Sequence, residues 1–301
     1  MALPVVLISR RAAGDAEAAV NRAFFERGLR LAAGGRQAEQ MVELDQAGCV
    51  AVRQRALPPP PDLASLIELL WITEWPAAAP GAHSWRIVPD PCAHSLVHVC
   101  ARQTRVAFVG ARSIHKDVDV SSRLLTVGVR LRSGALRPLI RADAHELTDR
   151  ALPLDDVFGK RGRVLAARIA ETGDAHHIVQ HLMQFLRSDC APSAAHADVR
   201  VITAARLIEL RHGQVSADEL ARHAGMAART LRSALRAHVG IGPNRFARIQ
   251  RLYHALELAL TRPAGRLART AAEAGYADQS HLVREFRALL GETPTQFLAR
   301  R

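Results

Sequence analysis

The stretch from Ala271 to Phe297 decides the fold of the last part of this 301-residue chain and reads AAEAGYADQSHLVREFRALLGETPTQF. A short helix is predicted to end before Gly275, a residue type that adopts the left-handed conformation of a tight turn without strain. Asp278 is a residue type that begins a helix, and Gly291 is one that ends a helix. The stretch therefore predicts two short helices joined by a tight turn, which is the helix-turn-helix pattern.

The second of these helices is predicted to have an apolar back and a polar front. Leu282, Phe286 and Leu289 recur at the helical period and are expected to face inward. The start of such a helix also offers free backbone N–H groups to a phosphate. The residues expected on the front, or at the helix start, are Gln279, Ser280, His281, Val283, Arg284 and Arg287.

The same pattern occurs earlier in the chain. Ser216 and Glu219 form a capping box that starts a short helix, and Gly225 is suited to the turn that follows. The next predicted helix runs over 228–239 and is closed by Gly240. Its back carries Leu231, Ala234, Leu235 and His238. The front of this helix is expected to contact a partner, and the residues expected to make the contact are Ala228, Arg229, Arg232, Ser233 and Arg236.

The two units are an internal repeat. Gly240-x-x-Pro243-x-x-Phe246 after the first unit corresponds to Gly291-x-x-Pro294-x-x-Phe297 after the second. Between the units, the helical period over 246–260 predicts a connecting helix of roughly 22 Å. Such a connector can hold two recognition helices in successive major-groove segments on one face of B-DNA, about 34 Å apart.

Positive charge is concentrated in the same region. Residues 196–301 contain 17 arginines and 9 acidic residues, and the whole chain has a net charge of +12. The chain is rich in alanine and arginine, as is typical of a GC-rich genome, so the charge alone is weak support for a polyanionic partner. Within a duplicated helix-turn-helix frame, however, arginines on both fronts indicate contact with duplex DNA, because a guanidinium can bond guanine or phosphate in a bidentate manner.

The front part of the chain is predicted to be mainly β. Four short apolar runs are separated by Pro, Gly, Asp and Ser, a pattern that favours a barrel or sandwich. They span 85–88, 96–99, 105–109 and 124–131. Two helices broken near Gly173 are expected over 164–186. Asp62 is expected to cap a helix in which Leu63, Leu66, Ile67, Leu70 and Trp71 give one buried face.

These features divide the chain into four parts and give an α+β fold class. Residues 1–40 are expected to be a poorly structured tail, with Met41 as an alternative start. Residues 41–188 are expected to be a β-rich domain, 189–198 a linker, and 199–301 a double helix-turn-helix domain with a linker helix. No run is long and apolar enough to span a membrane, and Arg10 and Arg11 follow the apolar start, which is the reverse of a secretory signal. A cytoplasmic location is therefore expected.

The second unit resembles the signature of the AraC/XylS transcriptional regulators over 271–286 and 291–297, and the resemblance extends over about 199–300. In the first unit Leu231 is kept, whereas Ser233 stands where the family pattern has Arg and Leu235 where it has Phe. The resemblance implies a sequence-specific transcription regulator, and the loss of an arginine at Ser233 weakens the expected base contacts of the first unit.

The front part resembles, more faintly, an uncharacterised N-terminal domain found in such regulators. The matching pieces are Val88-Pro89-Asp90-x-Cys92-x-x-x-Leu96, Phe108-Val109-Gly110 and 127–135, although Pro91 stands where that pattern has Gly. The resemblance implies a cupin-like β-barrel used for sensing or dimerisation. The expected partners are double-stranded operator DNA, RNA polymerase, a small-molecule effector and a second copy of the chain.

Two other classes of function are left open by the residues alone. One is an enzyme linked to a DNA-binding domain, such as an alkyl-acceptor repair protein that uses Cys92, and the other is a non-specific architectural DNA binder. The chain shows no catalytic motif, and its four cysteines lack zinc-type spacing. His94 and His98 share a strand face, yet no carboxylate lies at a matching strand position, so no metal, cofactor or catalytic residue is predicted.

Overall fold

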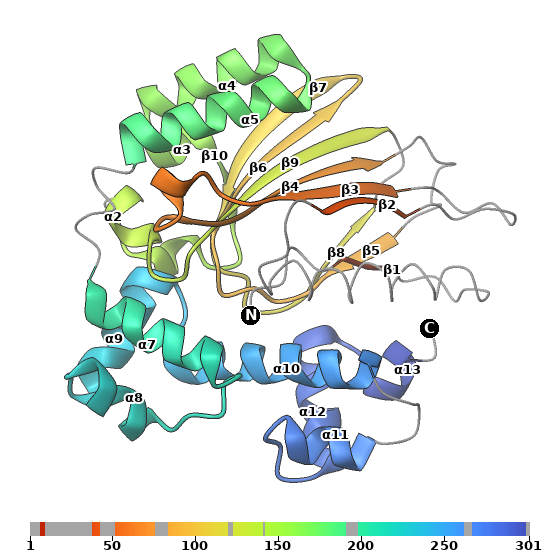
Figure 1. Ribbon diagram of the computed structural model, residues 1–301, viewed down its shortest axis with the longest axis vertical. Helices are drawn as coiled ribbons and strands as arrows, with labels where there is room; N and C mark the ends of the chain where they lie inside the picture. The colour runs from red at the N-terminus through yellow and green to blue at the C-terminus, as the bar shows by residue number, and fades with distance from the viewer. Residues whose placement is uncertain are drawn as a thin grey trace, which may run out of the picture.

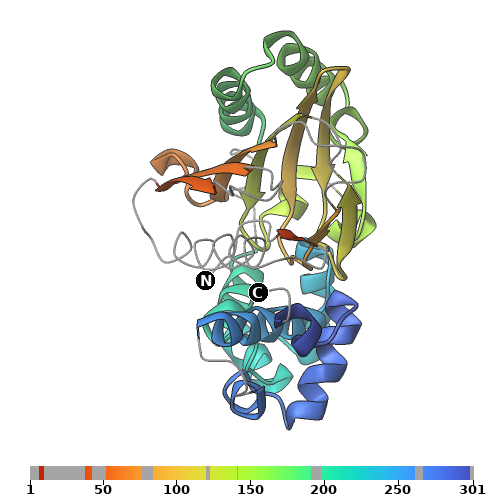
Figure 2. The ribbon, with the colours of Figure 1, turned by 90° about the vertical axis from the view of Figure 1, so that its right-hand side faces the viewer.

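The computed structural model describes residues 7–9, 38–42, 52–75, 84–119, 123–140, 142–190, 198–261 and 267–298. These residues form a β-rich front domain followed by an all-helical domain, which confirms the α+β fold class. Figure 1 shows the sheets above the helical domain, and Figure 2 shows the same two layers from the side.

The main sheet of the front domain has seven antiparallel strands in the order β10-β7-β6-β9-β4-β3-β2. All four runs that the sequence predicted to be strands form strands, one of them in the smaller sheet described below. At the centre, Trp71 lies opposite Gly128, and a Cβ on Gly128 would be 2.0 Å from the indole ring, so only glycine fits there. The strands are β2 (Ala38–Val42), β3 (Val52–Leu57), β4 (Ile67–Trp75), β6 (His94–Cys100), β7 (Gln103–Val109), β9 (Leu124–Leu131) and β10 (Ala151–Pro153).

A second sheet has three antiparallel strands in the order β1-β5-β8. They are β1 (Leu7–Ser9), β5 (Ser84–Ile87) and β8 (Lys116–Asp119). Strand β1 lies within residues 1–40, the stretch expected to be a poorly structured tail, and β2 crosses its end. The rest of residues 1–40 lies outside the described part of the chain.

The prediction of a helix that begins at Asp62 is wrong. Only the 3-10 turn η1 (Pro61–Leu63) forms there, and Ile67 to Trp75 is strand β4. Seven of the nine residues of β4 are buried, because both faces of this central strand are covered. The sequence of a strand that is buried on both faces is a continuous run of apolar residues. Such a run also has apolar residues at the helical spacings i, i+3 and i+4, so it can be mistaken for a helix.

Helices cover one face of the main sheet. The hairpin of α4 and α5 breaks at Gly173, as predicted, and packs over β7 and β9 (Figure 1). Its buried side chains, including Leu165, Ile169 and Leu182, form one core with sheet residues such as Val97 and Phe108. The helical elements of the front domain are α2 (Leu136–Ile140), η2 (Ala144–Leu147), α3 (Leu154–Phe158), α4 (Lys160–Thr172), α5 (Ala175–Phe185) and the π-helix η3 (Leu186–Cys190).

The helical domain contains two short helix pairs joined by a long helix. The connecting helix α10 has 19 residues, longer than the sequence predicted, and is about 28 Å long. A single apolar core runs through both units. The helices are α7 (Val199–Leu210), α8 (Ala217–Ala224), α9 (Ala228–Val239), α10 (Pro243–Thr261), α11 (Leu267–Glu273), α12 (Gln279–Leu290) and α13 (Pro294–Leu298).

The two domains are packed against each other. Val88 and Ala111 of the front domain belong to the apolar core of the helical domain. The Tyr253 hydroxyl on α10 donates to the Pro89 carbonyl, and the Arg245 guanidinium donates to the Ser113 carbonyl at 2.6 Å. No helix in the described ranges has both the length and the apolar character needed to cross a bilayer.

A buried group of charged side chains lies where the domains meet. Arg130 on β9 is 1% exposed and donates to the Asp90 carboxylate at 2.7 Å, and Asp90 also contacts the ring of His94 at 3.0 Å. Burial acts to raise the pKa of Asp90, but the charges of Arg130 and His94 outweigh it, so that pKa is lowered. From the helical domain, Glu209 accepts a hydrogen bond from Ser133 at 2.7 Å, and burial followed by the charge of Glu68 raises its pKa.

Candidate nucleic-acid interface

The first helix-turn-helix unit is built as its sequence predicts. The Ser216 hydroxyl accepts from the backbone N–H of Glu219 at 3.1 Å and caps α8. Gly225 ends α8 with a φ of 60°, in the left-handed region, and the chain then turns into α9. Leu231, Leu235 and His238 on the back of α9 are buried. The front of α9 is thereby fixed toward solvent.

Every candidate residue on the front of α9 is exposed. They are Ala228, Arg229, Arg232, Ser233 and Arg236. Helix α9 contains no acidic residue, and none of its three arginines has an ion-pair partner among the residues that the structure describes. Three guanidinium groups on one helix face therefore point to solvent, ready to contact a phosphate or a base.

The second unit presents a similar face on α12. Leu282, Phe286 and Leu289 are buried, whereas Val283 is half-buried. Arg284 and Arg287, like those of α9, have no ion-pair partner within the described ranges. The fully exposed candidates are Gln279, Ser280, Arg284 and Arg287.

His281 was expected on the exposed front of α12, but its side chain is half-buried against the turn before that helix. Its ring lies edge-on to Tyr276, with ring centroids 5.3 Å apart, and its Nδ1 accepts from the backbone N–H of Ala277 at 3.3 Å. The half-buried imidazole is therefore part of the turn before α12. Its backbone N–H is also occupied, because the Asp278 carboxylate accepts from it at 2.6 Å. The start of α12 thus offers fewer free N–H groups to a phosphate than the sequence predicted.

The start of α9 is better suited to an anion. Its N-cap residue, Ala227, has no side chain that can accept a hydrogen bond from the first turn. The first N–H groups of α9 are thus left for solvent or for a phosphate, and the helix dipole favours a negative charge there. Thr230, which sequence reasoning missed, is exposed in the same turn. Its position three residues before Ser233 was the signal that could have found it.

The front domain caps the opposite ends of both recognition helices. At the end of α9, the Thr148 hydroxyl donates to the carbonyl of Gly240 at 2.8 Å. At the end of α12, His115 donates its backbone N–H to the carbonyl of Leu289 at 3.0 Å, and Arg86 donates to the carbonyl of Leu290. Both helices therefore point their starting ends away from the front domain, and the carbonyls of Gly240, Leu289 and Leu290, which the helices themselves leave unpaired, have partners there.

The cysteine considered for an alternative enzymatic function is not a reactive thiol. Cys92 is 1% exposed, and burial raises the pKa of its thiol well above the ordinary value. A neutral, buried thiol is a poor nucleophile. Asp90 does lie beside His94, which the sequence did not predict, but no group of three or more His, Cys, Asp or Glu side chains in the described ranges could hold a metal ion.

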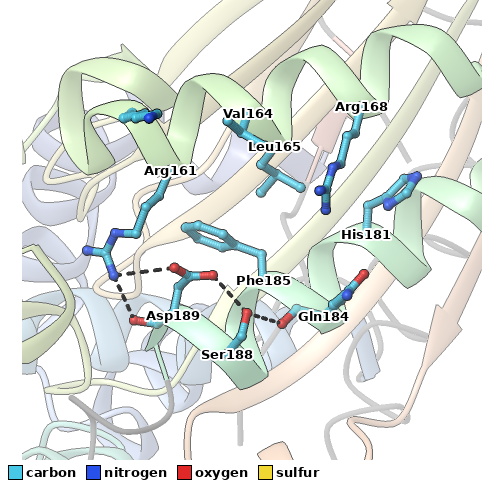
Figure 3. A pocket seen from close by; sticks show the side chains of 10 residues that line it. Arg161, Val164, Leu165, Arg168, His181, Gln184, Phe185, Ser188 and Asp189 are labelled. Carbon is cyan, nitrogen blue, oxygen red and sulfur yellow. Dashed lines mark hydrogen bonds and ion pairs between the residues drawn. The ribbon is translucent and has the colours of Figure 1, made fainter.

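A pocket of about 310 Å³ lies on the front domain between α4 and the end of α5 (Figure 3). Leu165 and Phe185 form its apolar floor, and both are less than 10% exposed. Arg161 is paired with Asp189 at 3.4 Å, whereas Arg168, which points toward His181, and Lys160 have no ion-pair partner in the described part of the chain. The pocket thus joins an apolar floor to two uncompensated cations.

Comparison with known families agrees with this geometry. Residues 220–300 match a helix-turn-helix domain family, which covers both recognition helices. Residues 220–300 are an AraC-type helix-turn-helix domain. Ahead of this AraC-type domain, residues 55–153 match a domain of unknown function, DUF6597. The two matches confirm both resemblances seen in the sequence, and the AraC-type domain is that of a DNA-binding transcription regulator.

Similarity to individual proteins is low. No curated protein matches the chain. The crystal structure of ToxT from Vibrio cholerae O395 is similar with a TM-score of 0.39 and 9% identity, over 71% of this chain and 93% of ToxT. The structure of unsaturated fatty acid bound wild-type ToxT from strain SCE256 gives 0.37 and 10%, over 85% and 97% of the two chains.

Proposed function

We propose that this protein is a sequence-specific transcription regulator that inserts α9 and α12 into successive major-groove segments of an operator. The observation that carries the proposal is the pair of solvent-facing helix fronts, each with arginines that have no ion-pair partner in the described ranges, on one rigid core. Arginine contacts to phosphates supply affinity that falls with salt, and the side chains facing base edges supply discrimination. The DNA-facing residues are those assigned on α9 and α12, except His281, which belongs to the turn.

The test compares binding of the full chain to its own promoter region and to random duplex of equal length. We expect the promoter to be bound at least about 10³-fold more tightly at physiological salt, as for specific regulators. Affinity for both duplexes should fall as salt is raised, because counterions are released from the phosphates. Equal affinity for the two duplexes at every salt concentration would instead identify a non-specific architectural binder.

The proposal includes a role for the front domain as a sensor. Because it caps the ends of both recognition helices, a change in the front domain can reach α9 and α12 through Thr148, Arg86 and His115. A small-molecule effector, a second copy of the chain and RNA polymerase are the partners that we propose for this regulation, which would take place in the cytoplasm. The pocket between α4 and α5 is the site that we propose for the effector.

The lining of this pocket favours a small molecule with one anionic group and an apolar part. Hexanoate is a suitable probe, with 1-hexanol as its neutral match. At ten times its Kd, hexanoate should stabilise the chain by about 1.4 kcal/mol, measured by thermal unfolding. Hexanol should stabilise less, and Arg168→Ala should remove the difference between the two probes. If hexanoate stabilises Arg168→Ala as much as the wild type, the effector site lies elsewhere.

A further inference from the structure

The two helix-turn-helix units contact each other directly, in addition to sharing α10. Gln214 lies in the loop between α7 and α8 of the first unit. Its side-chain amide donates to the carbonyl of Glu273, the last residue of α11, at 3.0 Å. Its Cγ and Cδ lie 2.6 and 2.8 Å from where a Cβ on Gly275 would be. A side chain of the first unit therefore covers the turn that directs α12.

The loop that carries Gln214 is itself fixed. Gly213, three residues after the end of α7, has a φ of 73° and donates its backbone N–H to the carbonyl of Ile208 at 2.8 Å. A Cβ on Gly213 would lie 2.0 Å from the carbonyl oxygen of Ala247, so the loop lies flat on the backbone of α10. Gln214 is thus held by the connecting helix while it contacts the second unit.

Helix α12 and the turn before it also contact the connecting helix α10. Arg248 on α10 donates to the Glu285 carboxylate at 2.7 Å, and the Glu285 side chain is only 14% exposed. The Arg251 guanidinium lies 6.0 Å from the centroid of the Tyr276 ring in the turn before α12. These contacts link α12 to α10, whereas the Gln214 contact links the second unit to the loop of the first.

We propose that Gln214 is a positioning residue, which fixes the distance and angle between α9 and α12 and so restricts the protein to operators with one spacing of the two half-sites. This inference rests on the proposed function, since spacing matters only if both helices enter the DNA. Each base pair inserted between the half-sites moves one half-site by about 3.4 Å along the DNA axis and rotates it by about 35° about that axis, relative to the other half-site. A rigid pair of helices cannot follow that change, whereas loss of the Gln214 contact should let α12 follow part of it.

The test uses the full chain and three operators: the footprinted sequence, and versions with one base pair inserted or deleted between the half-sites. The wild type should bind the altered operators at least about tenfold more weakly than the native one. Gln214→Ala should reduce that penalty to less than about threefold. Gln214→Met, which keeps the packing over Gly275 but not the hydrogen bond, should lie between the two. Gln180→Ala, at an exposed glutamine on α5 outside the proposed effector pocket, should behave as the wild type.

A second measurement needs no DNA. Amide hydrogen exchange at residues 275–278 should be at least about tenfold faster in Gln214→Ala, while exchange within α9 stays unchanged. If the wild type binds no genomic DNA, the proposed function fails, and exchange alone decides whether Gln214 holds the turn. If the wild type binds DNA and Gln214→Ala keeps the wild-type spacing penalty, the proposal for Gln214 is wrong although the proposed function stands.

Discussion

Arg284→Ala is expected to weaken binding to the native operator by about 1–3 kcal/mol, which is roughly a 5- to 150-fold rise in Kd. Arg284 lies opposite the buried back of α12, where Leu282 and Phe286 pack, and it has no ion-pair partner among the described residues. The loss of one good arginine contact with a base accounts for that range. Titration of operator fragments with the full chain would measure it.

Ser233→Ala is the matched control for Arg284→Ala. Gly240 ends α9 as Gly291 ends α12, and Ser233 and Arg284 each lie seven residues before their glycine. Ser233 is exposed but is short and uncharged, so its loss should change the Kd by less than about twofold. A larger loss for Ser233→Ala than for Arg284→Ala would reverse our ranking of the two units.

The salt dependence of binding distinguishes two roles of Arg284. The slope of log Kd against log salt should stay the same in Arg284→Ala if Arg284 contacts a base, and fall by about one if it contacts a phosphate.

Arg130→Met should cause the largest loss of stability, about 3–5 kcal/mol in the free energy of unfolding at neutral pH. Arg130 is 1% exposed and has Asp90 at 2.7 Å and Glu68 at 3.5 Å. Removal of its charge leaves a buried carboxylate without its main partner. Urea unfolding would measure the loss. Arg187→Met, which breaks an exposed pair with Asp62, is the control and should change little.

The pH dependence of stability gives an independent check on Arg130. In the wild type the pKa of Asp90 is lowered in the folded state, so its contribution is present above the unfolded pKa of about 3.9 and is lost as pH falls through the folded value. Without Arg130, burial should raise that pKa, and the contribution of Asp90 should then favour folding as pH falls. A wild-type pH profile in Arg130→Met would contradict this role.

The helical domain could be predicted from the sequence because its signals are local. The capping residues Ser216 and Asp278 and the turn glycine Gly225 act within a few residues of their own positions, and each has the role that its residue type predicts. The main sheet was harder to predict. Strand β4 is buried on both faces, so it lacks the alternation that identifies a strand, and its apolar run was interpreted as a helix.

The contacts that join parts distant in the chain could not be predicted from sequence. Arg86 and Leu290 are 204 residues apart, and Gln214 and Glu273 are 59 residues apart, yet each pair is hydrogen-bonded. Neither Arg86 nor Gln214 belongs to a motif, and both are ordinary polar residues until the fold brings their partners to them. The candidate DNA-facing side chains were found from periodicity, whereas the residues that orient the two helices were found only in the structure.

The caps at the ends of α9 and α12 have a consequence for how a signal is transmitted. Thr148, Arg86 and His115 belong to one domain, so a displacement of that domain would transfer the carbonyls of Gly240, Leu289 and Leu290 to water in a single event. Neither half of the operator would be released before the other. If the proposed effector acts through these caps, a graded rise in its concentration should change the fraction of promoters that are occupied, and partly engaged complexes should be rare.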